Sequence, residues 1–153
     1  MTLELNAPAP DFTLKNQHGE DVTLSALRGK PTLVVFYPFA FSGICTGELC
    51  EIRDNLNDFE SLGVRVLAIS CDPMFSLRAW SEADGYTFDL LSDFWPHGET
   101  ARNYGIFAEG PGAAARGSYL IDSEGILRWK VENDLGQARD LVAYRDAIAA
   151  LEN

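Results

Sequence analysis

Residues 32–70 read TLVVFYPFAFSGICTGELCEIRDNLNDFESLGVRVLAIS, with an apolar segment at each end of the stretch. These two segments, 32–37 and 64–70, are continuous and rich in β-branched and aromatic residues, which is typical of strands buried on both faces. Between them, apolar residues recur at steps of three and four, as in an amphipathic helix. A helix that joins two parallel strands forms a βαβ unit, and we predict one here. The apolar positions of this helix are Leu49, Ile52, Leu56 and Phe59.

The remaining patterns extend this unit into a larger sheet. Alternating apolar residues around Gly19 predict a short hairpin over 12–24, and a second hairpin is predicted over 118–131. Apolar periodicity predicts further helices over 75–84, 99–104 and 141–151. This order of elements predicts an α/β fold with three layers, α/β/α, and a mixed central sheet. Because no repeat, linker or low-complexity tract divides the sequence, we expect one domain over residues 1–153.

Composition limits the classes of function. The 153 residues carry 12 Lys and Arg against 23 Asp and Glu, a net charge of −11 that disfavours binding to nucleic acid or to an anionic membrane. The longest apolar run falls short of the roughly 20 residues that a membrane-spanning helix needs. No secretory signal is visible, so a cytoplasmic location is expected. Three cysteines suit a reducing compartment with catalytic or buried thiols better than a disulfide framework.

The first cysteine occupies a position that favours chemistry. Cys45 follows the carboxyl end of the first predicted central strand, where open α/β sheets place their sites, and falls in the first turn of the next helix. Unpaired backbone N–H groups and the helix dipole favour an anion there, and hence a nucleophilic thiolate. The hydroxyl of Ser42 can donate to the thiolate or to an incoming oxygen, and Pro38 stiffens the loop that leads to it.

The spacing Pro38-x-x-x-Ser42-x-x-Cys45 resembles the active-site pattern of the peroxiredoxins, with Ser in place of the commoner Thr. Segments along nearly the whole chain share the resemblance, and residues 39–45 and 91–98 look most like the AhpE branch of that family. The further matching segments are 9–14, 68–72, 90–93, 104–105 and 116–122.

The resemblance implies a thioredoxin-like fold, reduction of hydroperoxides with neither metal nor organic cofactor, and assembly into dimers or larger rings. It also implies that Arg116 reaches Cys45 and the peroxide, where a permanent cation stabilises the thiolate and the charge on the departing oxygen. Cys45 would attack one peroxide oxygen and become a sulfenic acid. Glu48, near the helix start, is a candidate to accept a hydrogen bond from Arg116 and orient it.

The second cysteine resembles the resolving thiol of the bacterioferritin-comigratory-protein branch. Five helical residues separate the Cα atoms of Cys45 and Cys50 by roughly 8–9 Å, beyond the disulfide limit of about 6.8 Å, so a bond between them requires the helix to unwind. Gly47 would ease this unwinding. A thioredoxin-type or mycoredoxin-type dithiol would then regenerate the enzyme. Cys71, at a strand end, is expected to be a buried filler.

For each candidate site residue, a purely structural role is the alternative to a catalytic one. Cys45 and Cys50 could be packed thiols, Ser42 only a helix cap, Glu48 only a favourable first-turn carboxylate, and Arg116 a surface cation. Cysteine spacing does not match a metal site. Phe36, Phe39 and Phe41 predict an apolar collar that would accept organic hydroperoxides. Two other functions remain open: a redox-signalling or holdase module switched by Cys45 oxidation, and a general thiol–disulfide oxidoreductase, which the lack of a Cys-x-x-Cys motif disfavours.

Overall fold

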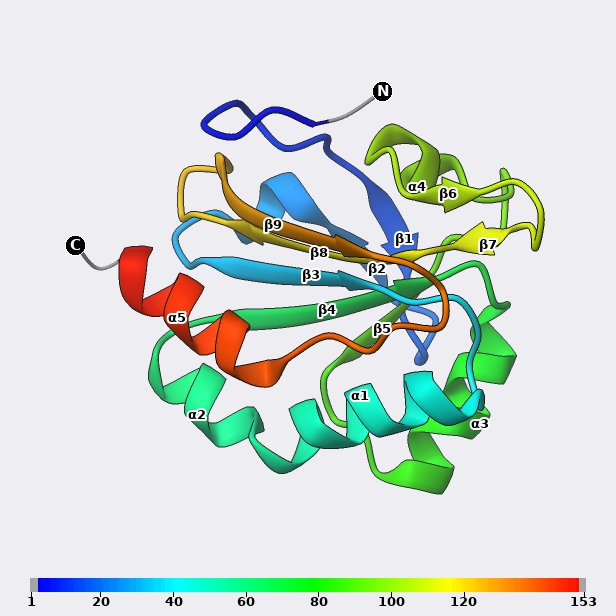
Figure 1. The fold of residues 1–153 in the computed structure, drawn as a ribbon. Coiled ribbons are helices and arrows are strands. Elements are labelled where there is room, and N and C mark those ends of the chain that lie inside the picture. The colour runs from blue at the N-terminus through cyan, green and yellow to red at the C-terminus, as the bar shows by residue number, and fades with distance from the viewer. Residues whose placement is uncertain (1–2, 152–153) are drawn as a thin grey trace.

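A computed structural model describes residues 3–151, and a mixed seven-stranded sheet runs through its middle (Figure 1). Its centre is the predicted βαβ unit, in which β3 (Thr32–Phe36) pairs in parallel with β4 (Arg65–Ser70), and β4 with β5 (Asp89–Ser92). Antiparallel strands extend both sides in the order β2-β1-β5-β4-β3-β8-β9. These outer strands are β1 (Thr13–Lys15), β2 (Asp21–Thr23), β8 (Arg116–Ile121) and β9 (Leu127–Asn133).

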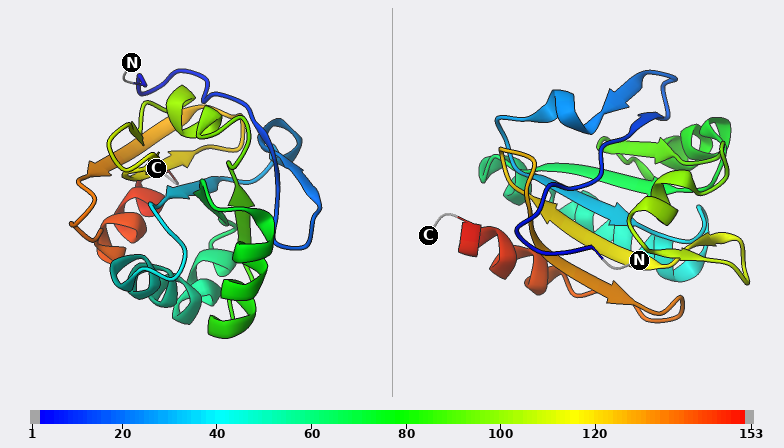
Figure 2. Two further views of the ribbon diagram at one scale, coloured as in Figure 1. Left: turned by 90° about the vertical axis from the view of Figure 1, so that its right-hand side faces the viewer. Right: turned by 90° about the horizontal axis from the view of Figure 1, so that it is seen from above.

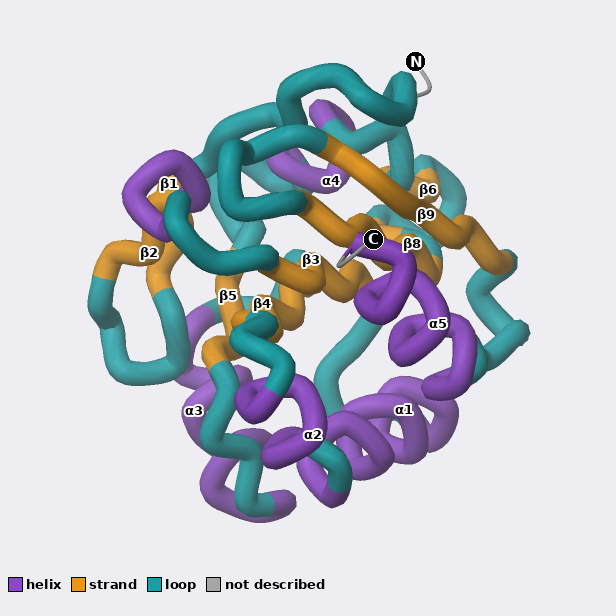
Figure 3. Tube along the Cα trace, turned by 90° about the vertical axis from the view of Figure 1, so that its left-hand side faces the viewer, coloured by secondary structure: helices purple, strands orange, loops and turns teal. Residues whose placement is uncertain are grey.

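Helices cover the two faces of the sheet unequally, as the end views show (Figures 2 and 3). Alternate residues of β3 point to opposite faces: Leu33 and Val35 join the core beneath the long helices, whereas Val34 and Phe36 join the second core. The first face is covered by α1 (Gly43–Asp54), α2 (Leu56–Ser61), α3 (Met74–Asp84) and α5 (Leu141–Leu151). The second face is covered by α4 (Glu99–Asn103), the 3₁₀ helix η1 (Leu24–Leu27) and the small hairpin of β6 (Phe107–Ala108) and β7 (Ala113–Ala114). The three-layer mixed-sheet prediction is confirmed.

The helix predicted between the central strands is two helices. Helix α1 ends at Asp54, and Asn55 leaves the helical conformation with φ −114° and ψ 15° before α2 begins. The side-chain amide of Asn55 donates to the carbonyl oxygen of Glu51 at 2.8 Å, and the backbone N–H of Asn55 donates to the same oxygen at 3.1 Å. The apolar period continues through the break because Phe59 of α2 still packs into the same core as Ile52.

The other predicted elements are present with small changes at their ends. Gly19 turns the first hairpin with φ +80°, a left-handed conformation that glycine adopts without steric cost. The second hairpin begins two residues earlier than predicted, so Arg116 is the first residue of β8 and lies opposite Asn133 of β9. Within residues 3–151, no helix is long and apolar enough to cross a membrane.

Candidate active site

The thiol of Cys45 lies at the start of α1, beneath the carboxyl end of β3. The chain leaves β3, passes through a loop and enters the helix at Gly43, with Ser42 as the N-cap residue (Figure 1). The Oγ atom of Ser42 accepts a hydrogen bond from the backbone N–H of Cys45 at 3.4 Å. Cys45 is fully buried, and Pro38 of the loop is buried as well. The structure therefore places Ser42 against Cys45 at the helix start, with Pro38 buried in the loop that leads there.

The loop is held in place by a residue that the sequence analysis did not assign. A carboxylate oxygen of Asp72, just beyond β4, accepts hydrogen bonds from the backbone N–H of Ala40 at 2.8 Å and from the hydroxyl of Ser70 at 2.7 Å. Asp72 thus ties the loop after β3 to the end of the neighbouring strand. Its position directly after a buried parallel strand was the available signal, because such ends meet at one edge of the sheet.

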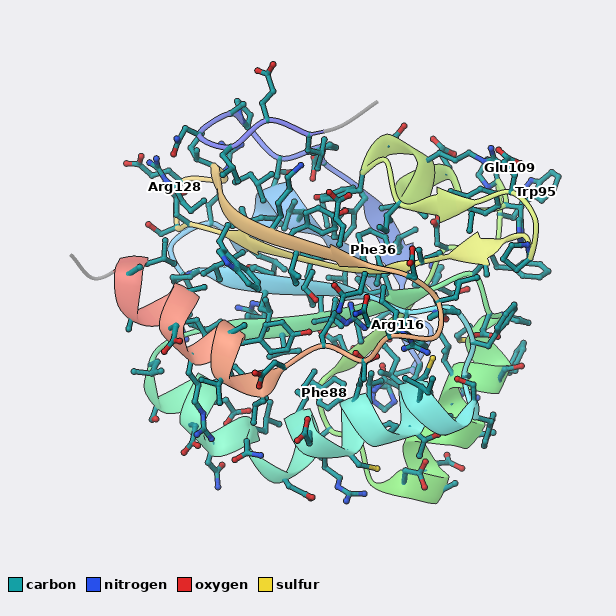
Figure 4. The ribbon with its side chains drawn as sticks, viewed as in Figure 1. Phe36, Phe88, Trp95, Glu109, Arg116 and Arg128 are labelled. Atoms are coloured by element: carbon teal, nitrogen blue, oxygen red, sulfur yellow. The ribbon has the colours of Figure 1, made fainter. Side chains whose placement is uncertain are left out.

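Glu48 and Arg116 form a buried ion pair, so Glu48 accepts the hydrogen bond for which it was a candidate. Nη1 of Arg116 donates to Oε1 of Glu48, and Nε of Arg116 donates to the carbonyl oxygen of Leu135 at 2.7 Å. Both side chains are at most 6% exposed, and Figure 4 shows Arg116 between the sheet and α1. The interpretation of Arg116 as a surface cation is therefore wrong.

A second buried cation, Arg139, completes this cluster and was missed by the sequence analysis. Its Nε donates to Oε2 of Glu48 at 2.9 Å and its Nη2 to Oε1 at 3.0 Å. Its Nη1 donates to the carbonyl oxygens of Phe36 and Gly117, at 2.7 and 2.9 Å. Arg139 therefore joins the ends of β3 and β8 to α1. It lies between β9 and α5, where the sequence has neither a periodic pattern nor a motif.

The charges of this cluster are strongly coupled. Burial disfavours the ionised form of Glu48, but hydrogen bonds and positive charge from Arg139, and then the charge of Arg116, lower the pKa of its carboxyl. Burial likewise opposes the charge of Arg139, yet its partners raise the pKa of the guanidinium, with Glu48 the strongest and Cys45 among them. Two guanidiniums thus face one carboxylate, which leaves one net positive charge beside the first turns of α1.

Cys50 and Cys71 occupy different surroundings. Helix α1 is continuous from Cys45 through Cys50, and the half-buried Sγ of Cys50 lies 3.4 Å from Oη of Tyr86. Cys71 is buried at the end of β4, where burial and then the charge of Asp93 raise the pKa of its thiol to about 11. The interpretation of Cys71 as a buried filler agrees with this environment.

The predicted apolar collar is partly wrong. Phe39 and Phe41 are 45% and 56% exposed in the loop before Cys45. Phe36 instead points to the opposite face of the sheet and packs against Tyr104 and Tyr119, with ring centroids 5.2 and 5.8 Å apart. Successive residues of a strand alternate between faces, so Phe36 cannot share the side of Leu33 and Val35. Among residues 3–151, no cluster of His, Cys, Asp and Glu has the arrangement of a metal site.

Comparisons with known proteins assign the family. Residues 5–130 match the model of the AhpC/TSA family. Alkyl hydroperoxide reductase E of Mycobacterium tuberculosis is 47% identical over 150 residues, which cover 97% of this chain and 98% of that protein. A peroxiredoxin of Thermoplasma volcanium is 34% identical, with 99% of this chain and 76% of that protein covered.

Solved structures agree with the sequence relatives. The structure of Enterococcus faecalis AhpC superposes with a TM-score of 0.91 at 27% identity, covering 99% of this chain and 93% of that one. The reduced 2-Cys peroxiredoxin of Plasmodium vivax has the same fold, with a TM-score of 0.89. These findings confirm the thioredoxin-like fold and favour a peroxidase over a redox-signalling or holdase module. The chain belongs to the AhpC/TSA family and is a peroxiredoxin, a thiol-dependent peroxidase.

Proposed function

We propose that Cys45 is the peroxidatic residue. Its thiolate sulfur attacks one oxygen of a hydroperoxide; the S–O bond forms as the O–O bond breaks, and the second oxygen leaves with a proton as water or an alcohol. The sulfur is oxidised to a sulfenic acid while the peroxide is reduced. Both the position of Cys45 in the first turn of α1 and the family of the chain support this assignment.

The observation that carries the proposal is the buried cluster of Arg116, Glu48 and Arg139. Its one excess positive charge stabilises the negative charge that develops on the departing oxygen. Because Glu48 holds both guanidiniums and itself lies in α1, the cluster is fixed relative to Cys45. Ser42 caps the helix through its oxygen lone pair, so its hydroxyl hydrogen can serve the peroxide, and Pro38 stiffens the loop.

Peroxide consumption by the wild type and by Cys45→Ser tests the assignment. The wild type, with a thiol reductant, should consume hydrogen peroxide rapidly, and a dimedone-type reagent should label Cys45 after one equivalent of peroxide. Cys45→Ser should show neither property, whereas the matched variant Cys71→Ala should show both. Consumption that persists in Cys45→Ser would overturn the proposal.

For the second half of the cycle, we propose that Cys50 resolves the sulfenic acid and that a thioredoxin-type or mycoredoxin-type dithiol reduces the resulting disulfide. Both thiols are free and lie on the same helix. Peptide mapping without reductant should therefore find a Cys45–Cys50 peptide after one equivalent of peroxide. A stable sulfenic adduct at Cys45 with free Cys50 would instead assign resolution to an external thiol.

We further propose that the substrates include organic hydroperoxides as well as hydrogen peroxide. The rings of Phe39 and Phe41 are exposed in the loop that leads to Cys45, and the mycobacterial relative is named an alkyl hydroperoxide reductase. A higher second-order rate constant for a long-chain hydroperoxide than for hydrogen peroxide is the expected result. Equal rate constants would contradict the proposed role of these rings.

We infer that the protein is one domain that assembles as a homodimer in the cytoplasm. A single sheet takes strands from both halves of the chain, which supports one domain over residues 1–153. Free thiols and a dithiol reductant suit a reducing compartment. The loops after the parallel strands β3 and β5, together with the first turn of α3 after β4, carry an aromatic surface that a second copy of the chain would cover. This aromatic surface consists of Phe39, Phe41, Phe75, Phe94 and Trp95.

A further inference from the structure

The thiol of Cys50 begins a chain of hydrogen bonds that leads away from Cys45. Its Sγ lies 3.4 Å from Oη of Tyr86, and this hydroxyl donates to Oδ2 of Asp84, also at 3.4 Å. A tyrosine hydroxyl has one hydrogen, so when it is given to Asp84 the Cys50 S–H must be the donor to Oη. This hydrogen bond ties the Cys50 sulfur to the Tyr86 hydroxyl, on the side of α1 that contacts the end of α3.

Tyr86 is rigidly placed to make this contact. It is 4% exposed, and its ring packs edge-on against Trp80 at 5.0 Å and lies 5.4 Å from Phe88. Close by, Nη1 of Arg53 donates to the carbonyl oxygen of Asp84 at 2.6 Å. The carboxyl-terminal half of α1 is therefore attached to the end of α3 at two points, Cys50 and Arg53.

We propose that Tyr86 is a latch for resolution: a positioning residue that holds the Cys50 side chain against the end of α3 until α1 opens. The inference rests on the proposed role of Cys50. On release, Cys50 loses its proton and attacks the sulfur of the Cys45 sulfenic acid; the S–S bond forms, the S–O bond breaks, and the hydroxide leaves with a proton as water. A closed latch lengthens the life of the sulfenic acid and so exposes it to a second peroxide, which converts it to sulfinic acid.

Tyr86→Phe tests the latch because it removes the hydroxyl and keeps the ring. The rate of Cys45–Cys50 disulfide formation is measured by mixing with one equivalent of peroxide, acid quenching, alkylation and mass spectrometry. Of the two hydrogen bonds that the hydroxyl makes, only the one to Cys50 ties α1 to the end of α3, so disulfide formation should be about three- to fivefold faster in Tyr86→Phe. Sulfinic acid formation at excess peroxide should fall in parallel.

Tyr104→Phe is the matched control. Tyr104 also has a buried ring and a bonded hydroxyl, which donates to the carbonyl oxygen of Pro10 at 2.7 Å, but it packs on the opposite face of the sheet. The Tyr104→Phe variant should form the Cys45–Cys50 disulfide at the wild-type rate. An equal acceleration in Tyr104→Phe would overturn the latch, because general loosening of the fold would then explain the effect.

A second measurement is independent of disulfide formation. In Cys45→Ser/Cys71→Ala, Cys50 is the remaining thiol, and adding Tyr86→Phe should raise its rate of alkylation by a similar factor. A wild type that forms no Cys45–Cys50 disulfide would overturn the resolving role and the latch together. A wild type that forms it, with unchanged or slower rates in Tyr86→Phe, would overturn the latch alone and leave the resolving role intact.

Discussion

Glu48 is the residue on which the cationic cluster depends, because its carboxylate is shared by two buried guanidiniums. Glu48→Gln removes the charge but keeps the shape, so Arg116 and Arg139 would face each other without neutralisation. We expect the free energy of unfolding at pH 7 to fall by about 3 kcal/mol. Urea unfolding followed by circular dichroism measures this loss. The control is Asp58→Asn, which breaks an exposed ion pair with Arg145 and should change stability little.

Glu48 should also make the free energy of unfolding depend on pH. The pKa of Glu48 is lower in the folded protein than its ordinary value of 4.5, so the unfolded state takes up a proton first as the pH falls. The stability that Glu48 contributes is therefore complete above about pH 4.5 and is lost as the pH falls through the lowered folded value. Glu48→Gln should lack this part of the acid destabilisation. An identical decline with pH in both proteins would contradict the assignment.

Cys71 should be chemically silent. With its thiol pKa raised to about 11, the fraction of thiolate at pH 8 is very small, and the side chain is buried. Iodoacetamide at pH 8 should therefore modify Cys71 in the native protein far more slowly than in urea, as peptide mapping would show. Equal modification rates in both states would mean that the thiol is reached by solvent.

At the scale of elements, α1 has to be both a capped helix that presents Cys45 and a segment that can open. Gly47 lies between the two cysteines, and a Cβ built there would meet nothing within 4 Å. Gly47→Ala should therefore fit and stabilise the helix by about 0.8–1.0 kcal/mol. Because the disulfide requires unwinding, its formation should slow by about fivefold. The same quench assay measures this rate, with Glu82→Ala on the exposed side of α3 as control.

Gly47→Ala should slow disulfide formation, whereas Tyr86→Phe should accelerate it. These opposite changes in rate separate two contributions to the opening of α1. The first variant strengthens the helix backbone, whereas the second weakens its attachment to the end of α3. A Gly47→Ala protein that forms the disulfide at the wild-type rate would show that the helix opens outside the turn containing Gly47.

At the scale of the whole molecule, the aromatic surface at one end of the sheet predicts association. Trp95 is 81% exposed and Phe75 is 70% exposed, and both follow carboxyl ends of parallel strands. Sedimentation velocity should give twice the mass of a single chain for the wild type, and a shift toward monomer for Trp95→Ser and for Phe75→Ser. Val142→Ser, at an exposed apolar position on α5, should remain dimeric. A monomeric wild type would contradict the proposed assembly.

Local sequence patterns were sufficient to predict much of the secondary structure and the motif around Cys45. Continuous apolar runs, three-and-four periodicity and turn glycines predict the central βαβ unit, both hairpins and the long helices, because each signal depends on neighbouring residues alone. The site motif of Pro38, Ser42 and Cys45 is local too, since Ser42 and Cys45 lie within one turn of the helix start and Pro38 lies in the loop that leads to it.

Contacts between residues far apart in the sequence determined the features that local patterns did not predict. Arg139 lies in an irregular segment and acquires its role only where α1, β3 and β8 converge on its guanidinium, so no local pattern marks it. At the end of α1, the side-chain amide and the backbone N–H of Asn55 share the carbonyl oxygen of Glu51, a contact that an apolar period does not reveal. Phe36 faces the second core because strand alternation and the packing of α1 assign the two sides of β3 together. Cys50 meets Tyr86 only because the end of α3 packs against α1, a contact between residues 36 positions apart that depends on the folded chain.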